Sequence, residues 1–212
     1  MPINRLARSL GSLRESTARL LWRAGVSPFH ITAMGLALAC ASGWLFYAGR
    51  FRWAAVVLLL SGCCDLFDGA VARVSGRVTA FGAFLDSTVD RLSDAAILCG
   101  ILLYYDRAET DTYSAVTAAY LVLVGSFLVS YTRARAESII GRCSVGIFQR
   151  PERVIVLAAA GLTGVTLMPA VLWFLVAATG FTVFQRVVYV WRSIRNGSAG
   201  GPARPGDAGR AA

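Results

Sequence analysis

The chain has 212 residues, a length that suits one domain of ordinary size. Hydrophobic residues make up 56% and charged residues 16% of it, which leaves too few polar side chains to cover a water-facing globule and excludes an ordinary soluble domain. The net charge is +9, and all 21 basic residues are arginine. Because these arginines flank apolar stretches, we expect anionic membrane lipid or a phosphorylated substrate as partner, and no nucleic acid.

Residues 4–24 are predicted to form an amphipathic helix that lies at the membrane interface. Leucines recur on one face of this helix, and most of its arginines lie elsewhere. Gly25 can end the helix. Ser27 and Pro28 can begin the next one, because serine is a favoured N-cap and proline suits a first turn.

Six transmembrane helices are predicted to follow. The first four cover residues 29–48, 53–72, 79–105 and 113–132. The uncharged run 154–185 would be about 48 Å long as one helix, well beyond a hydrocarbon core of roughly 30 Å. Gly164 and Pro169 are therefore predicted to divide it into the fifth and sixth helices.

The fold class predicted from these elements is an all-α integral membrane protein with one membrane domain over residues 1–195. Residues 196–212 are mostly glycine, alanine and proline, and we expect a disordered tail there. Arginines gather at one set of helix ends, whereas the other ends carry only Arg50, Arg52 and Arg107. We therefore expect a protein of the cell membrane. The positive-inside rule places both of its termini, and the turn between the second and third helices, in the cytoplasm.

Four aspartates occupy the second and third predicted helices, where acidic side chains are costly and usually functional. Asp65 and Asp68 are three residues apart, and Asp86 and Asp90 are four apart, so each pair shares a helical face. A short turn is expected to make the two helices antiparallel neighbours, which brings the pairs to one site. Four close carboxylates repel one another, and one or two divalent cations would relieve the repulsion.

An alternative is that arginines neutralise these acids without any metal. Arg73, Arg77 and Arg91 are close enough along the chain to serve. A further alternative, from outside the enzymes, is a small membrane transporter in which the acids bind a transported cation.

The acidic run resembles the signature of the CDP-alcohol phosphatidyltransferases. Its eight fixed positions are Asp65, Asp68, Gly69, Ala72, Arg73, Gly82, Asp86 and Asp90. The predicted six-helix topology after a cytoplasmic surface helix is similar to that family too. The resemblance implies that a hydroxyl group displaces CMP from a CDP-linked lipid, with two ions of Mg²⁺ or Mn²⁺ as cofactor, and that the protein is a homodimer.

The resemblance also implies roles for individual residues. Asp65, Asp68, Asp86 and Asp90 would bind the metal, and Asp90 would also take the proton from the attacking hydroxyl as the catalytic base. The CDP-lipid would contact Pro28, His30, Ile31, Thr32, Gly69, Arg73 and Thr79. Family members carry Pro-Asn or Pro-Asp before the first span, whereas this chain has Pro28-Phe29.

Several cytoplasmic arginines predict that the second substrate is phosphorylated, because a neutral alcohol does not need several guanidinium groups. Arg133, Arg153 and Arg186 are the proposed phosphate-binding residues. The segments 130–137, 150–153 and 185–186 around them resemble the phosphatidylinositol phosphate synthase branch, whose acceptor is inositol 3-phosphate and whose donor is CDP-diacylglycerol. The alternative acceptor is glycerol 3-phosphate, used by phosphatidylglycerol phosphate synthases.

Overall fold

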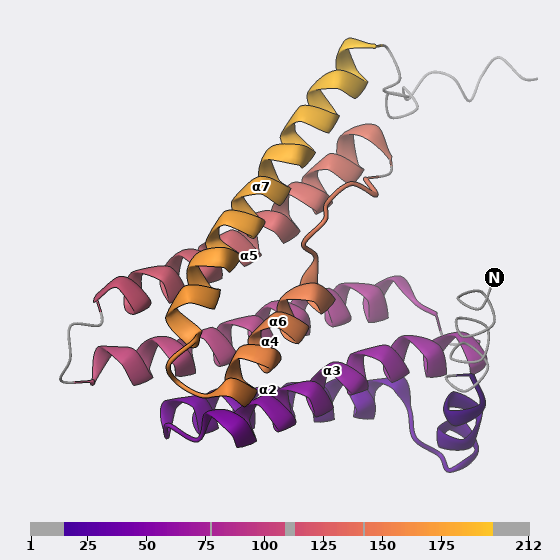
Figure 1. Cartoon of the computed structure of the whole chain (residues 1–212). Coiled ribbons are helices and arrows are strands. Elements are labelled where there is room, and N and C mark those ends of the chain that lie inside the picture. Colours follow the sequence, from indigo (N-terminus) through magenta and orange to yellow (C-terminus); the bar gives the residue numbers. More distant parts are fainter. Residues whose placement is uncertain (1–14, 77, 109–112, 142, 197–212) are drawn as a thin grey trace, which may run out of the picture.

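Figure 1 shows the computed structural model of the chain, which describes residues 15–76, 78–108, 113–141 and 143–196. Within those ranges every regular element is a helix, as the sequence predicts. The helices are α2 (Pro28–Tyr47), α3 (Phe51–Val74), α4 (Ala80–Asp106), α5 (Tyr113–Ile140), α6 (Arg150–Thr163) and α7 (Met168–Arg195).

Four of these helices, α2, α3, α5 and α7, are long and apolar enough to cross a membrane. The chain is therefore a multi-pass membrane protein. Helix α4 has sufficient length with 27 residues, but Asp86, Asp90, Arg91 and Asp94 make its first half strongly polar. Helix α6 has only 14 residues. The count of six spans accordingly stays a prediction.

Helix ends coincide with the predicted ones where a strong local signal exists. The Ser27 hydroxyl accepts a hydrogen bond from the backbone N–H of His30 at 3.4 Å and caps α2, with Pro28 in the first turn. Gly164 follows α6 with a φ of 102°, and Pro169 lies in the first turn of α7. Helices α5 and α7 extend beyond the predicted apolar spans and include the polar residues that follow them.

Only part of the predicted interfacial helix falls within the described residues. Residues 15–23 are helical, and Ala18 is buried in a small cluster with Ile31, Cys64 and Val71. This segment therefore packs against α2 and α3. Residues 4–14 of the predicted helix and 197–212 of the predicted tail lie outside the described residues, and both expectations stay predictions.

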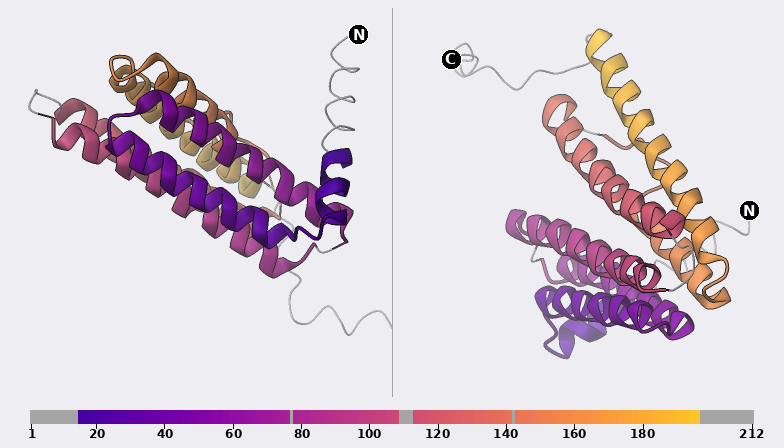
Figure 2. Two further views of the ribbon diagram at one scale, coloured as in Figure 1. Left: turned by 90° about the horizontal axis from the view of Figure 1, so that it is seen from below. Right: turned by 90° about the vertical axis from the view of Figure 1, so that its left-hand side faces the viewer.

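Helix α2 organises the half of the molecule that carries the aspartates. It packs against both α3 and α4, which run antiparallel but do not pack closely on each other over the described residues. The expectation that α3 and α4 are direct neighbours is therefore corrected: α2 holds them, and their polar halves face a shared space. Figures 1 and 2 show α5 and α7 packed together as a second unit that points away from this group.

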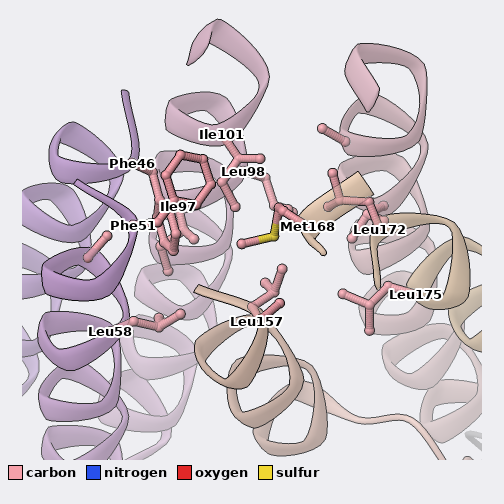
Figure 3. Packing of buried hydrophobic residues seen from close by; sticks show 14 of the residues in the cluster. Phe46, Phe51, Leu58, Ile97, Leu98, Ile101, Leu157, Met168, Leu172 and Leu175 are labelled. Atoms are coloured by element: carbon pink, nitrogen blue, oxygen red, sulfur yellow. The ribbon is translucent and has the colours of Figure 1, made fainter. Parts of the chain in front are cut away.

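The two units are joined by direct packing of α4 on α5 and by helix α6, which lies in the hydrophobic core. It packs against α3 on one side and α7 on the other. Figure 3 shows Leu157 of α6 and Met168 of α7 between Phe46 of α2 and Leu175 of α7. The start of α6 is thereby positioned against the polar part of α3.

Two glycines allow the backbones of α2 and α4 to touch. A Cβ atom at Gly100 would overlap the carbonyl of Gly43, and one at Gly43 would overlap the carbonyl of Ala96. Small residues at such crossings let membrane helices approach closely, where packing drives their association. The atoms in conflict belong to the backbone, so no rotamer change can relieve the overlap.

We predict that Gly100→Ala lowers the stability of the protein by about 1 to 3 kcal/mol, the usual cost of overpacking. The measurement is the midpoint of thermal unfolding in detergent. Gly180→Ala is the matched control, because a Cβ there meets nothing within 4 Å and alanine favours a helix. Equal midpoints for the two variants would contradict the close crossing.

Candidate active site

A cavity of about 600 Å³ lies between the start of α2, the second half of α3 and the first turns of α4. Two signature aspartates, Asp68 and Asp86, line it from opposite helices, and Arg73 adds a cation. The rest of the wall includes apolar side chains such as Val78 and Phe81. Such a cavity suits a ligand with a charged group at one end and an apolar body.

Asp68 is the most buried of the four signature acids. It is 6% exposed, and its Oδ2 accepts a hydrogen bond from the Thr32 hydroxyl at 2.9 Å. Its Oδ1 accepts one from the backbone N–H of Gly69. Since Thr32 also reaches the carbonyl of Pro28 at 3.1 Å, this contact ties the first turn of α2 to α3.

The first residue of α6, Arg150, places its guanidinium group among the other acids. Its Nη1 contacts Oδ2 of Asp65 and lies 2.7 Å from Oδ1 of Asp90. Its Nε donates to Oδ1 of Asp94 at 3.3 Å. The Arg150 side chain is 16% exposed, so water screens these contacts only weakly. One cation from α6 thus neutralises charge on both α3 and α4.

Asp94 holds a second arginine as well. Its Oδ2 accepts a hydrogen bond from Nη2 of Arg153 at 2.7 Å, so a single carboxylate connects two arginines of the first turn of α6. The sequence analysis assigns no role to Asp94, and it includes Arg150 only in the segment 150–153 of the predicted acceptor region, with no contact to the acids. Asp94 follows Asp90 by four residues and shares its helical face, which is a usable signal. Arg150 is 85 residues from Asp65, and no local spacing reveals that contact.

The signature carboxylates supply the oxygen ligands that Mg²⁺ and Mn²⁺ prefer. With the side chains as they stand, the described part of the chain contains no group of three acidic, histidine or cysteine side chains placed to hold an ion. The reason is visible in their partners, because Asp65 and Asp90 turn toward Arg150 and Asp68 turns toward Thr32. The donor set fits a divalent ion, provided that these carboxylates turn away from those partners.

Most of the residues predicted to contact a CDP-lipid line the cavity: Pro28, Thr32, Gly69, Arg73 and Thr79. The Thr79 hydroxyl also caps α4 by accepting a hydrogen bond from the N–H of Gly82 at 3.0 Å. His30 and Ile31 do not belong to the wall. His30 is exposed and meets the ring of Phe29 edge-on, and Ile31 is buried in the cluster beneath the N-terminal segment. Contacts of these two residues with a ligand stay a prediction.

The three arginines predicted to bind the acceptor phosphate come from different helices but meet one face of α5. Nη1 of Arg186 contacts the carbonyl of Val129, and Arg153 lines a small cavity with Ser126. Arg133 belongs to α5 itself, at i+4 from Val129 and i+7 from Ser126, which is the spacing of a single helical face. The structure therefore gathers all three along one side of α5.

These arginines differ strongly in their surroundings. Arg153 and Arg186 are only 3% and 2% exposed, whereas the Arg133 side chain is 51% exposed and pairs with Glu137 at 3.0 Å. Arg186 donates to the carbonyl of Val145 at 2.9 Å. Nη1 of Arg153 is buried and has no hydrogen-bond partner among the described residues. Arg153 and Arg186 are therefore held inside the protein, whereas Arg133 has its charge at the surface, and phosphate binding by all three stays a prediction.

Comparison with known proteins gives consistent relatives. The chain is 41% identical over 173 residues to archaetidylinositol phosphate synthase of Methanothermobacter thermautotrophicus, covering 78% of this chain and 84% of that protein. Its fold is similar to that of Mycobacterium tuberculosis phosphatidylinositol phosphate synthase with CDP-DAG bound, with a TM-score of 0.76, 33% identity, and coverage of 85% and 94% of the two chains. The same M. tuberculosis enzyme in complex with manganese and citrate gives a TM-score of 0.75 and 35% identity, covering 84% and 88%.

The family-level match extends over nearly all the helices described above. Residues 26–191 match the family described as CDP-alcohol phosphatidyltransferase, from the start of α2 to the last turns of α7. All four signature aspartates lie inside that range, and so do the residues predicted to contact the two substrates. The transporter alternative is set aside on this ground. The chain belongs to the CDP-alcohol phosphatidyltransferase family, and it is a transferase.

Proposed function

We propose that the protein transfers the phosphatidyl group of CDP-diacylglycerol to a hydroxyl of inositol 3-phosphate, giving phosphatidylinositol phosphate and CMP. One observation carries the proposal: signature acids from α3 and α4 line one cavity together with Thr32 and Arg73. The similar M. tuberculosis structure with CDP-DAG bound supports the donor. The names of that enzyme and of the archaeal relative support an inositol phosphate as acceptor.

The donor is proposed to lie in the 600 Å³ cavity. Arg73 is exposed at its wall and offers a guanidinium group to the diphosphate, which carries negative charge. Val78 and Phe81 are exposed apolar side chains beside it and suit the lipid part. Thr32 and Gly69 would contact the nucleotide where α2 and α3 meet.

The reaction is a substitution at phosphorus. The acceptor oxygen bonds to the phosphorus that carries diacylglycerol, the bond from that phosphorus to the CMP oxygen breaks, and the acceptor hydroxyl loses its proton. A divalent ion bound by Asp65, Asp68, Asp86 and Asp90 would neutralise the diphosphate and stabilise the departing CMP. We propose two such ions, and the manganese complex of the M. tuberculosis enzyme supports the choice of metal.

Asp90 is proposed to accept the proton. It shares a face of α4 with Asp86, which lines the cavity, and its Oδ1 lies 2.7 Å from Nη1 of Arg150 at the start of α6. The acceptor would approach from the α6 side, with its phosphate held by Arg133, Arg153 and Arg186. A phosphomonoester carries a charge of about −1.5 to −2 at neutral pH, so several guanidinium groups stabilise it.

Orientation and assembly belong to the same proposal. We propose that the active site faces the cytoplasm, because Arg73, Arg133 and Arg153 lie at the helix ends near the site, whereas Arg50 and Arg107 lie at the opposite ends. We also propose one catalytic domain over residues 1–195 and a homodimer, both as the family resemblance implies.

The acceptor is tested with purified protein, CDP-diacylglycerol and Mn²⁺ or Mg²⁺. We expect CMP release with inositol 3-phosphate, little with free inositol or serine, and none in EDTA, with recovery when the metal is restored. Preference for glycerol 3-phosphate would replace the proposal with the phosphatidylglycerol phosphate synthase alternative. Full turnover in EDTA would exclude the metal site.

Asp90→Asn is expected to lower kcat by about 10² to 10⁴, the usual contribution of a general base. Binding of CDP-diacylglycerol, measured by calorimetry in detergent, should stay near the wild-type value. Asp68→Asn is the comparison, because Asp68 lines the donor cavity and its loss should weaken donor binding. Equal loss of donor binding in both variants would contradict a separate role for Asp90.

Arg133→Ala is the sharpest test of the acceptor phosphate site, since this arginine is exposed and its loss leaves no buried charge unpaired. Loss of one charge-assisted hydrogen bond costs about 1.5 to 3 kcal/mol, so kcat/KM for inositol 3-phosphate should fall by roughly ten- to a hundred-fold. The KM for CDP-diacylglycerol should change little. Arg192→Ala, an exposed arginine of α7, is the control and should keep both constants. Unchanged acceptor kinetics in Arg133→Ala would remove this residue from the site.

A further inference from the structure

Arg150 makes contacts that no role in donor or acceptor binding explains. Its Nη1 contacts Asp65 and is 2.7 Å from Asp90, and its Nε is 3.3 Å from Asp94. The three carboxylates come from α3 and α4, whereas Arg150 begins α6. It reaches them because the segment 143–149 leads from the end of α5 to a point beside α3 and α4 (Figure 1).

Two of these three carboxylates are the proposed metal ligands Asp65 and Asp90. The oxygen atoms that face Arg150 are Oδ2 of Asp65 and Oδ1 of Asp90, and both meet the same nitrogen atom. A guanidinium group and a divalent cation repel each other, and they cannot occupy the space between the same two oxygens. Arg150 therefore supplies, between these two carboxylates, the positive charge that a bound metal ion would otherwise supply.

Asp94 can still bind Arg150 after the contacts of Arg150 with Asp65 and Asp90 are broken. Asp94 is not part of the eight-position signature, and its second oxygen is held by Arg153 at 2.7 Å. The Arg150 contact to Asp94 uses Nε, near the base of the guanidinium group, whereas the contacts to Asp65 and Asp90 use Nη1 at its tip. A rotation about the Cδ–Nε bond leaves Nε in place beside Asp94 and moves Nη1 away from Asp65 and Asp90.

We propose that Arg150 is an internal counter-cation that competes with the divalent metal for Asp65 and Asp90, and that Asp94 retains it when the metal binds. The inference rests on the proposed function only for the identity of the metal ligands. It makes Arg150 a positioning residue with two opposite effects: it stabilises the metal-free protein, and it weakens metal binding.

The test measures Mn²⁺ binding to purified, metal-stripped protein by calorimetry, with neither substrate present. Arg150→Gln removes the charge and should bind Mn²⁺ at least about tenfold more tightly, since a charge-assisted contact no longer has to be broken. Its thermal midpoint without metal should fall below that of the wild type, and Mn²⁺ should raise it by more. Arg192→Gln removes the same charge at an exposed position of α7 and should match the wild type in both measurements.

Arg150→Lys keeps a cation but lacks the separate nitrogens that reach Asp94 and the two metal ligands. Its Mn²⁺ affinity should lie between those of the wild type and Arg150→Gln. If Arg150→Gln does not fold, the affinity of Arg150→Lys relative to the wild type tests the competition. Affinity equal to or weaker than the wild type in the folded variants would overturn the competition. Asp65→Asn should lose Mn²⁺ affinity, and if it does not, the metal ligands of the proposed function are wrong, which is a different failure.

Discussion

Mutual repulsion among buried and half-buried carboxylates is the constraint around which this protein is arranged. Asp68 and Asp94 are buried, Asp65 and Asp90 are half-buried, and negative charges so placed destabilise the fold unless each has a partner. The structure supplies those partners from elements remote in sequence. Thr32 of α2 donates to Asp68, and Arg150 and Arg153 of α6 meet the other acids. Helices α3 and α4 can consequently pack on α2 while their polar halves stay apart.

The helices themselves were predictable because their signals are local. Ser27 and Pro28 mark a helix start whatever surrounds them, and Gly164 with Pro169 divides a hydrophobic run that is too long for one crossing. Packing between helices was not predictable in the same way. A short turn indicates antiparallel direction but not contact, and the close approach of Gly43 to Gly100 depends on two glycines that are 57 residues apart in the numbering of the chain.

In the candidate site, too, the features set by local spacing were predictable and the tertiary contacts were not. The spacing of Asp65, Asp68, Asp86 and Asp90 was sufficient to predict that they share helical faces, and the cavity lined by Asp68 and Asp86 agrees with it. The arginine alternative weighed for these acids was partly right, because arginines do neutralise them. Nη1 of Arg91 lies 3.5 Å from Oδ2 of Asp90, as that alternative allowed, whereas the cation shared by Asp65 and Asp90 is Arg150. Arg77 lies outside the described residues. The sequence predicts Arg153 and Arg186 as phosphate ligands, which stays a prediction, but it does not predict their surroundings. Burial and their partners, Asp94 and the carbonyls of Val129 and Val145, depend on the tertiary structure alone.

The close crossing of α2 and α4 at Gly43 and Gly100 restricts how the acidic end of α4 can move. Gly100 is ten residues beyond Asp90, a separation of about 15 Å along a helix. Close backbone packing at the crossing resists sliding of α4, whereas a tilt about that point keeps the contact and changes the position of Asp90. On a lever arm of about 15 Å, a tilt of roughly 4° moves the carboxylate by about 1 Å, a distance that separates a hydrogen bond from a broken one. Small changes in the angle of α4 about this crossing are therefore enough to exchange the partners of the acids.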